Sequence, residues 1–471
     1  MRLRALVHPW GLVLASLALA ACGGATTPPV EVPEASPRVA RGTVTLPPEV
    51  EAGVVVSWLE PELLADPARG FEAVIAAGAH ALVLPADSTG TVPFELPVAG
   101  GPEVHLVAWL APPARGVFAM YARPGAVSPP VDLREETRVE LTLEAPEEPP
   151  PAEERCVGER VELFELPAPR GTAGGDETAR LCAYLPADYE EDPARRYPVI
   201  YSLPGMGGSH AGGVAELLRT LLDLGNPPGD AIVVGVDTST PTGASYLVDS
   251  PITGPWADYV TRDVIAAVDG RLRTLPERDH RAVVGHSTGG FNAVSIALRR
   301  PEVWGTIAAS SPDALDFASW LLDASGRRAQ PVWQGWIHTE DALGWPGQLI
   351  SYAVEWSPDA AAPRGFRWPI DLRTGEVIDE VWARWLAESP VTWLDDDEGL
   401  ARARRFDDHL YLTCGRPDEP LLFVPTERFH EALDRVGITH TWEPTELRHQ
   451  GSVPDRFESM LRYVMARIGE S

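Results

Sequence analysis

The feature that most constrains the fold of this chain is the glycine-lined segment Gly285-His286-Ser287-Thr288-Gly289-Gly290. It directly follows the apolar run Ala282-Val283-Val284 and precedes a segment of helical character, 291–300. The bare pattern G-x-S-x-G would arise by chance roughly 0.2 times in a chain of this length and glycine content, so the flanking segments carry the prediction. Glycines on both sides permit a sharp strand-to-helix turn that holds a serine in a strained, exposed position. We therefore predict a nucleophilic serine for acyl-group hydrolysis or transfer.

Strand-like and helix-like segments alternate after Cys156. A predicted hairpin, 160–166 with 179–185, is followed by strand-like runs at 198–203, 231–236, 281–284, 306–309, 409–413 and 440–444. Helix-like segments lie between these runs at about 213–224, 256–275, 291–300, 426–436 and 454–468. Such alternation is typical of an α/β fold, in which helices cover both faces of a mostly parallel sheet.

A smaller all-β domain is predicted at 38–144. Short β-branched or aromatic runs at 42–46, 54–59, 92–96, 103–109, 117–122 and 138–143 are separated by glycine and proline, which indicates a β-sandwich. The pattern resembles the carboxypeptidase-regulatory or transthyretin-like sandwiches of extracellular enzymes. Its aromatic residues Trp58, Trp109 and Tyr121 are expected in a core, although an exposed row would suit carbohydrate binding. Linkers at 22–37 and 145–155 bound this domain and leave 156–471 for the α/β domain, with a cap-like insertion at about 313–405.

The first 22 residues resemble a lipoprotein signal peptide. Arg2 and Arg4 precede the apolar stretch 11–19, and the segment ends in Leu19-Ala20-Ala21-Cys22. The resemblance implies cleavage after residue 21, acylation of Cys22 and attachment to the extracytoplasmic side of a bacterial membrane. The alternative is an ordinary secretory signal with a chance cysteine. The apolar core is too short to span a bilayer, so we expect membrane contact through the lipid only.

Composition excludes several function classes. The formal net charge of −29 makes nucleic acid an unexpected partner. All 39 basic residues are arginine, which excludes Schiff-base and pyridoxal chemistry, a P-loop lysine and a Ser-Lys dyad. No cysteines or histidines fall at metal-ligand spacing, so no metal site is predicted. Cys156 and Cys182 flank the predicted hairpin and could form a disulfide in an oxidising compartment, whereas Cys414 is expected to be buried and inert.

Four landmarks in 156–471 carry a resemblance to the esterase branch of the α/β-hydrolases. They are Tyr201 to Gly208, the segment Gly285 to Gly290, Cys414 to Asp418, and His449 before the last helix. This branch includes feruloyl and acetylxylan esterases, S-formylglutathione hydrolases and mycolyltransferases. The resemblance implies a doubly wound sheet and serine chemistry without a cofactor, and it leaves the substrate open.

The chain order serine, acid, histidine matches that of the α/β-hydrolases and predicts a triad. Ser287 is the expected nucleophile, and His449 the expected base because its loop lies between the last strand and the last helix. Asp418 is the expected acid, with the adjacent Glu419 as an alternative. Arg448 stands where the family usually has glycine before this histidine.

Two backbone N–H groups are expected to bind the oxyanion, those of Thr288 and Met206. Pro204 replaces the family's usual histidine before the glycine of the second loop. Trp256 resembles a residue beside the elbow and is a candidate substrate contact. Nine tryptophans of the insertion could cap a substrate or form the insertion's own core, and we leave both open: Trp320, Trp333, Trp336, Trp345, Trp356, Trp368, Trp382, Trp385 and Trp393.

We therefore expect an extracytoplasmic, lipid-anchored serine esterase that acts on a small-molecule or glycan-linked carboxylic ester. Two alternatives use the same fold. One is acyl transfer to a sugar or lipid hydroxyl through the same triad, and the other is an inactive hydrolase fold that serves as a binding module.

Overall fold

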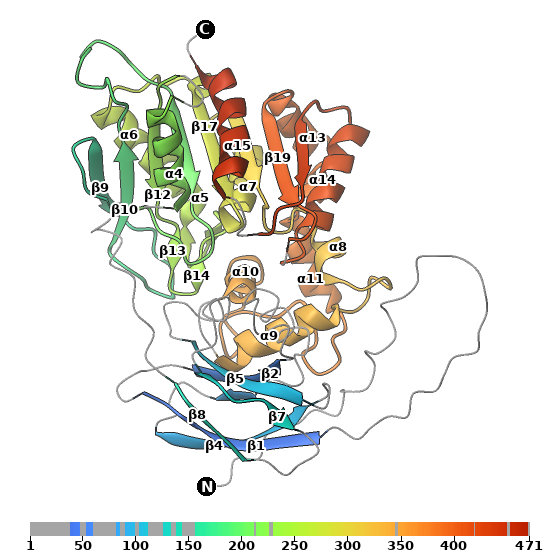
Figure 1. The fold of residues 1–471 in the computed structure, drawn as a ribbon. Helices are drawn as coiled ribbons and strands as arrows, with labels where there is room; N and C mark the ends of the chain where they lie inside the picture. The colour runs from blue at the N-terminus through green and yellow to red at the C-terminus, as the bar shows by residue number, and fades with distance from the viewer. Residues whose placement is uncertain are drawn as a thin grey trace. The chain divides into compact units, whose positions relative to one another are not determined.

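A computed structural model of the protein describes residues 38–47, 53–59, 82–84, 90–98, 103–111, 126–132, 138–143, 156–211, 213–225, 229–343, 347–418, 420–449 and 453–469. These residues divide into two compact units (Figure 1). One unit holds the N-terminal strands together with helix α9 (Pro331–Leu343). The other holds the rest of the described chain from residue 156 onward.

The N-terminal unit contains two sheets. One has the strand order β4 (Thr91–Val98), β1 (Arg38–Thr45), β8 (Arg138–Thr142). The other has the order β3 (Leu82–Leu84), β2 (Gly53–Leu59), β5 (Glu103–Ala111), β6 (Ala126–Val127), and β7 (Val131–Asp132) also pairs with β5. Trp109 is buried and Trp58 is half-buried, which favours a core role for both. The expected strand at 117–122 and its Tyr121 lie outside the described residues.

An eight-stranded sheet forms the centre of the second unit, and the predicted α/β fold is confirmed. Its two edge strands on one side form the predicted antiparallel hairpin, and the other six strands are mutually parallel. The strand order is β20 (Thr441–Thr445), β19 (Leu410–Gly415), β18 (Thr306–Ser310), β17 (Arg281–His286), β11 (Val199–Leu203), β12 (Ile232–Val236), β10 (Thr178–Tyr184), β9 (Val161–Pro167).

Helices cover both faces of this sheet, and every residue of β11, β12, β17 and β18 is buried, as a parallel sheet requires. Ile200 shares a buried cluster with side chains of α4 (Gly213–Asp223) and α15 (Val453–Ile468). Its neighbour Tyr201 points to the opposite face, because side chains alternate along a strand, and there it meets Trp304. Figure 1 shows α4, α7 (Thr288–Arg299) and α15 beside these strands.

The predicted helix at 256–275 is wrong in detail. The chain forms α5 (Trp256–Asp258), a π-helical turn η3 (Tyr259–Val264) and α6 (Ile265–Arg271), and it is already extended at Leu272. Short elements complete the described connections before β18: β13 (Ser239–Thr240), β14 (Gly243–Ala244), β15 (Asp249–Ser250), β16 (Gly254–Pro255) and the 3-10 helix η4 (Arg278–His280).

The insertion between β18 and β19 is helical and aromatic. In the second unit its helices are α8 (Phe317–Leu321), α10 (Gln348–Trp356), α11 (Asp379–Ala387), α12 (Pro390–Trp393), α13 (Asp397–Ala403) and η5 (Arg404–Phe406), and α14 (Phe423–Arg435) follows β19. Six of its tryptophans are buried there, which favours the core interpretation: Trp320, Trp356, Trp368, Trp382, Trp385 and Trp393. Trp333 and Trp336 belong to α9, which is part of the other unit, and their rings stack on each other. Trp345 lies outside the described residues.

The expected signal peptide, Cys22 and the first linker lie outside the described residues. Among the helices that the structure describes, none combines the length and the apolarity needed to cross a membrane.

Candidate active site

Ser287 occupies the turn between β17 and α7 with a φ of 58° and a ψ of −127°. A residue other than glycine in this region carries strain of about 1–3 kcal/mol, which the surrounding structure must hold in place. The neighbouring glycines make the turn possible. A side chain on Gly285 would come within 2.2 Å of the backbone of Gly289, and one on Gly289 within 2.1 Å of the Leu203 carbonyl. The turn therefore has the geometry expected of a nucleophile elbow.

The structure brings the three predicted triad residues together. His449 Nε2 lies 3.0 Å from Ser287 Oγ, and His449 Nδ1 lies 2.9 Å from Asp418 Oδ2. The carboxylate of Asp418 is fully buried, so it can only accept from protein donors. Both distances are within hydrogen-bond reach. Glu419, the alternative acid, lies outside the described residues.

Backbone turns, rather than long elements, place the acid and the histidine. Asp418 closes a turn after β19 by donating its N–H to the Gly415 carbonyl at 3.1 Å. His449 lies in the loop between β20 and α15. The two loops cross at Gly415, where a side chain would lie 1.6 Å from the Leu447 carbonyl oxygen. Glycine at this position is thus a steric condition for the contact between Asp418 and His449.

Burial and nearby charges shift the pKa values of two neighbouring histidines, His449 and His286, in opposite directions. Burial alone would lower the pKa of His449, but the charge of Asp418, its hydrogen bond and the charge of Asp313 outweigh burial and raise this pKa. His286, whose ring lies 4.7 Å from that of His449, has a pKa well below its ordinary value because of burial and the nearby charges of His449 and Arg456. His286 therefore stays neutral while His449 titrates.

The two predicted oxyanion donors belong to the residue after the nucleophile and to the loop 205–208. Thr288 is the first residue of α7, and the first N–H groups of a helix have no partner within it. Met206 lies in a turn in which Gly208 donates its N–H to the Gly205 carbonyl at 2.9 Å. Gly207 takes the positive φ of 70° that this turn needs. A side chain on Gly205 would lie 3.5 Å from the Ser287 Cβ atom, so this loop runs beside the nucleophile.

Asp313 is a site residue that the sequence reasoning missed. It is 1% exposed, it follows β18 by three residues, and its Oδ1 lies 3.4 Å from Ser287 Oγ. Its Oδ2 accepts from Thr288 Oγ1 at 2.7 Å and from the Tyr246 hydroxyl at 2.8 Å. Burial raises the pKa of Asp313, and these two hydroxyls act against that rise. One feature of the sequence could have indicated Asp313: it is an acidic residue shortly after β18, the strand that pairs with β17 before the Ser287 turn.

Arg456 is a second residue that the sequence reasoning missed, and no sequence signal pointed to it. This buried arginine of α15 donates to the carbonyls of Arg448 and His449 at 2.8 and 3.2 Å, and to Ser311 Oγ at 2.9 Å. It therefore ties the histidine loop to the end of β18. The side chain of Arg448 has no part in these bonds, so arginine in place of the family's glycine leaves this anchor intact.

Comparison with known proteins identifies the family. The family described as "Putative esterase" matches residues 175–445, which is more than half of the chain. The chain belongs to this esterase family. The prediction made from the landmarks is thereby confirmed.

Among similar proteins, an esterase of Mycobacterium tuberculosis is 30% identical over 302 residues, which cover 60% of this chain and 55% of that protein. An uncharacterized protein of Corynebacterium glutamicum is 26% identical over 212 residues, or 44% of this chain and 48% of the relative. The chain thus spans about half the length of these relatives. A solved S-formylglutathione hydrolase from Agrobacterium tumefaciens superposes with a TM-score of 0.40 at 19% identity, covering 66% of this chain and 95% of that one.

Trp256 is a packing residue of this esterase rather than the substrate contact that the sequence suggested. Its side chain is buried, and its indole N–H donates to the Thr253 carbonyl at 3.0 Å. Its ring meets the edge of Tyr259 at 5.6 Å. Burial and a satisfied N–H are what a core tryptophan needs.

Cys156 and Cys182 form a disulfide that links the start of the described hydrolase unit to β10. Cys414 is a free cysteine and is buried at the end of β19. Burial raises the pKa of its thiol well above the ordinary value, with a further contribution from the charge of Asp418. Such a thiol is a poor nucleophile.

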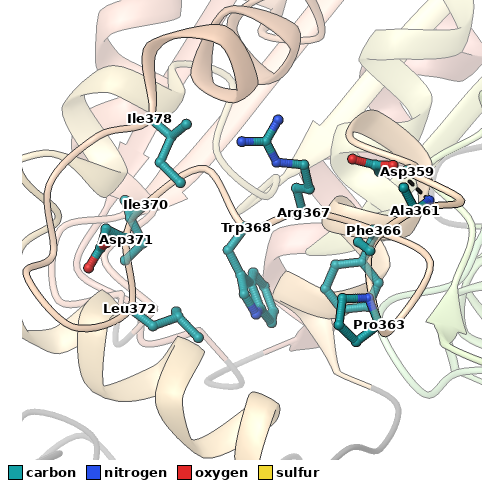
Figure 2. Close-up of a pocket in the computed structure, with 11 residues that line it drawn as sticks. Asp359, Ala361, Pro363, Phe366, Arg367, Trp368, Ile370, Asp371, Leu372 and Ile378 are labelled. Atoms are coloured by element: carbon teal, nitrogen blue, oxygen red, sulfur yellow. Dashed lines mark hydrogen bonds between the residues drawn. The ribbon is translucent and has the colours of Figure 1, made fainter.

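A cavity of about 440 Å³ lies in the insertion of the esterase and away from the triad loops. Figure 2 shows its side chains around the indole of Trp368. Its apolar lining is Phe366, Trp368, Ile370, Leu372 and Ile378, with Asp359, Arg367 and Asp371 among the polar members. None of its lining residues belongs to the triad or to the oxyanion loop.

A histidine-aspartate cluster forms outside the site, where the sequence predicted no metal ligands. His430, Asp434 and His440 place one ligand atom each within 4.8 Å of one another. His440 Nδ1 donates to the Ile438 carbonyl at 2.9 Å, which leaves Nε2 to accept from His430 Nδ1 at 2.7 Å. His430 Nε2 then faces Asp434 Oδ2 at 3.6 Å, and His440 Nδ1 lies 3.9 Å from Asp434 Oδ1. The ring nitrogens of this cluster therefore have one another, a backbone carbonyl and Asp434 as neighbours, and none of the three residues belongs to the triad.

Proposed function

We propose that this chain is an extracytoplasmic serine esterase that cleaves a carboxylic ester through an acyl-enzyme. One observation carries the proposal: the unbroken hydrogen-bond chain from the strained Ser287 through His449 to the buried Asp418. Membership in the esterase family supports it. A hydroxyl, a base at 3.0 Å and an acid that fixes the base are the parts that acyl transfer to serine requires.

In the proposed mechanism Ser287 Oγ attacks the ester carbonyl and transfers its proton to His449 Nε2. Asp418 holds the opposite nitrogen as a donor and stabilises the imidazolium. The N–H groups of Thr288 and Met206 bind the oxyanion of the tetrahedral intermediate. The bond to the alkoxy oxygen breaks, the alcohol leaves with the proton from His449, and water then cleaves the acyl-enzyme by the same steps. No metal or cofactor is required for this sequence.

The pH dependence follows from the base. His449 accepts the serine proton only when it is neutral, and its pKa is raised above the ordinary 6.5. Activity is therefore expected to fall as the pH drops through a value above 6.5.

The location is part of the proposal. The small-small-Cys ending at Cys22 and the Cys156–Cys182 disulfide both support a lipid-anchored protein outside the cytoplasm, where disulfides persist. A Cys22→Ala variant should lose fatty-acid labelling and move from the membrane fraction to the soluble one. Equal labelling of the variant would exclude this anchor.

A fluorophosphonate probe tests the chemistry directly. The folded protein should form one adduct, which Ser287→Ala removes and Ser209→Ala, a serine outside the triad, leaves in place. Absence of a Ser287-dependent adduct would exclude serine catalysis. A panel of p-nitrophenyl acyl chains, feruloylated and acetylated sugars, each with and without an alcohol acceptor, then defines the substrate and separates hydrolysis from acyl transfer.

A further inference from the structure

Asp313 places a second carboxylate at the nucleophile, in addition to the acid that orients His449. Its Oδ2 accepts from two hydroxyls, those of Thr288 and Tyr246, at 2.7 and 2.8 Å. Each hydroxyl has one proton, and both are directed to this oxygen. The other oxygen, Oδ1, faces Ser287 Oγ at 3.4 Å. The carboxylate is thus held with one oxygen anchored and one aimed at the reacting hydroxyl.

Ser287 also has only one proton and two acceptors within reach. His449 Nε2 at 3.0 Å is closer than Asp313 Oδ1 at 3.4 Å, so the proton of the resting enzyme goes to His449. When His449 is protonated it becomes the donor, and Ser287 can then donate to Asp313. Ser287 Oγ therefore has an acceptor in both protonation states of the base, His449 when it is neutral and Asp313 when it is protonated. This pair of acceptors fixes the rotamer of the nucleophile.

The charge of Asp313 acts on His449 as well as on the serine. Proton transfer from Ser287 creates an imidazolium, and a buried carboxylate nearby favours that charged form. In a buried site such an interaction is weakly screened by solvent. Asp313 also anchors the backbone, because its N–H donates to the Ser287 carbonyl at 3.1 Å.

We propose that Asp313 is a second carboxylate of the catalytic centre, which orients the Ser287 hydroxyl and stabilises the protonated form of His449. This proposal deepens the proposed function and rests on it. It adds Asp313 to the triad as a fourth reacting residue. Tyr246 and Thr288 are then positioning residues, because their hydroxyls hold Asp313.

Asp313→Asn tests the charge, because the amide has nearly the same shape and its oxygen still accepts from hydroxyls. The variant should lower kcat about tenfold, well short of the loss of a triad residue. It should also move the acid limb of the kcat/KM profile to lower pH, and lower the pKa of His449 in an NMR titration of the resting protein. Glu355→Gln is the matched control, since Glu355 is a buried carboxyl bonded to the Tyr246 N–H at 2.7 Å. It should leave the pKa of His449 unchanged.

Two outcomes would overturn the proposal: an unchanged pKa of His449 in Asp313→Asn, or an equal shift in Glu355→Gln. If Asp313→Asn does not fold, Tyr246→Phe supplies a weaker version of the same test, because the carboxylate loses one donor and is less stable as an anion. The NMR titration needs no substrate. A protein that forms no Ser287-dependent fluorophosphonate adduct would refute the proposed function, while the titration would still decide whether Asp313 acts on His449.

Discussion

The loops at the carboxyl edge of the sheet and the insertion between β18 and β19 bury polar groups in different ways. In the loops, Asp418 and His449 are buried, but their hydrogen-bond chain ends at the partly exposed Ser287. In the insertion, the polar groups bond to partners that are themselves buried: the Trp385 indole donates to Ser357 Oγ at 3.0 Å, and Glu355 accepts from Thr253 Oγ1, outside the insertion, at 2.9 Å. The first network ends at an accessible hydroxyl, whereas the bonds of Trp385 and Glu355 join buried groups only.

This difference assigns the chemistry to the loops and a structural role to the insertion. A polar network that ends at an accessible hydroxyl can exchange a proton with a substrate, whereas a fully buried one holds its elements in place. The aromatic residues of the insertion agree with the supporting role. Tyr352 stacks on Trp356 at 4.1 Å, and Phe317 lies 4.7 Å from the same indole. Substitutions in the loops should therefore change rates, and those in the insertion should change stability.

Loss of the nucleophile should have the largest effect. Ser287→Ala is expected to lower kcat by roughly 10⁵- to 10⁶-fold, because the other members of a triad act only through the serine. The free energy of unfolding should change little, since the hydroxyl makes few contacts. Steady-state kinetics with a p-nitrophenyl ester and urea denaturation measure the two quantities. A stable variant that retained a tenth of the wild-type kcat would contradict the role of Ser287.

Loss of the triad acid should have the second largest effect on kcat. Asp418→Asn leaves the shape of the turn but removes the acceptor that holds His449 Nδ1, and kcat should fall on the order of 10³- to 10⁴-fold. Glu419→Gln is the matched control and should change kcat less than about threefold. A larger loss in Glu419→Gln than in Asp418→Asn would reverse the assignment of the acid.

Ser287 and Asp418 could be predicted from the sequence because each follows a buried strand at a short offset, and His449 because it lies between the last strand and the last helix. Ser287 comes directly after β17, and Asp418 lies three residues past β19. His449 precedes the last helix. Topology brings the ends of parallel strands together, so sequence position alone placed these side chains. The position of Asp313, three residues past β18, fits the same pattern, but its role depends on the hydroxyls of Thr288 and Tyr246. Arg456 lies within α15, and its role depends on the carbonyls of the histidine loop.

The insertion was predictable only as an aromatic segment. Its packing joins Phe317, Tyr352 and Trp385, which lie up to 68 positions apart and have no common period. Sequence reasoning could not decide whether the tryptophans face a substrate or one another. The helix expected at 256–275 was also too long, since nothing in its residues signals the π-helical turn at Tyr259–Val264.

Removal of an insertion tryptophan should act on stability. Trp385 is fully buried against Tyr352 and Trp356, so Trp385→Ala should lower the free energy of unfolding by about 3–5 kcal/mol. The kcat of the protein that remains folded should fall less than about threefold. Urea denaturation and kinetics below the unfolding transition measure both. A selective rise of KM without loss of stability would instead place Trp385 at the substrate.

The smallest effect is expected at Glu355 and depends on pH. Burial, opposed by the hydrogen bonds from Tyr246 and Thr253, raises the pKa of Glu355 to about 8. A carboxyl whose pKa is raised on folding favours the folded state fully below its unfolded pKa of about 4.3, and this contribution is lost as the pH rises through about 8. Because Gln cannot ionise, the Glu355→Gln variant should not show this loss of stability.

The stability of wild type relative to Glu355→Gln should therefore decline between pH 5 and pH 9, by on the order of 1 kcal/mol or more at the upper end. Urea denaturation of both proteins at several pH values measures the difference. Activity per folded molecule should stay alike in the two proteins, because the amide oxygen of the Glu355→Gln variant can still accept from the Tyr246 N–H, and Asp313 bonds the hydroxyl of Tyr246 instead. A pH-independent difference in stability would mean that Glu355 is ionised in the folded protein throughout this range, and that the insertion holds a buried charge instead of a neutral acid.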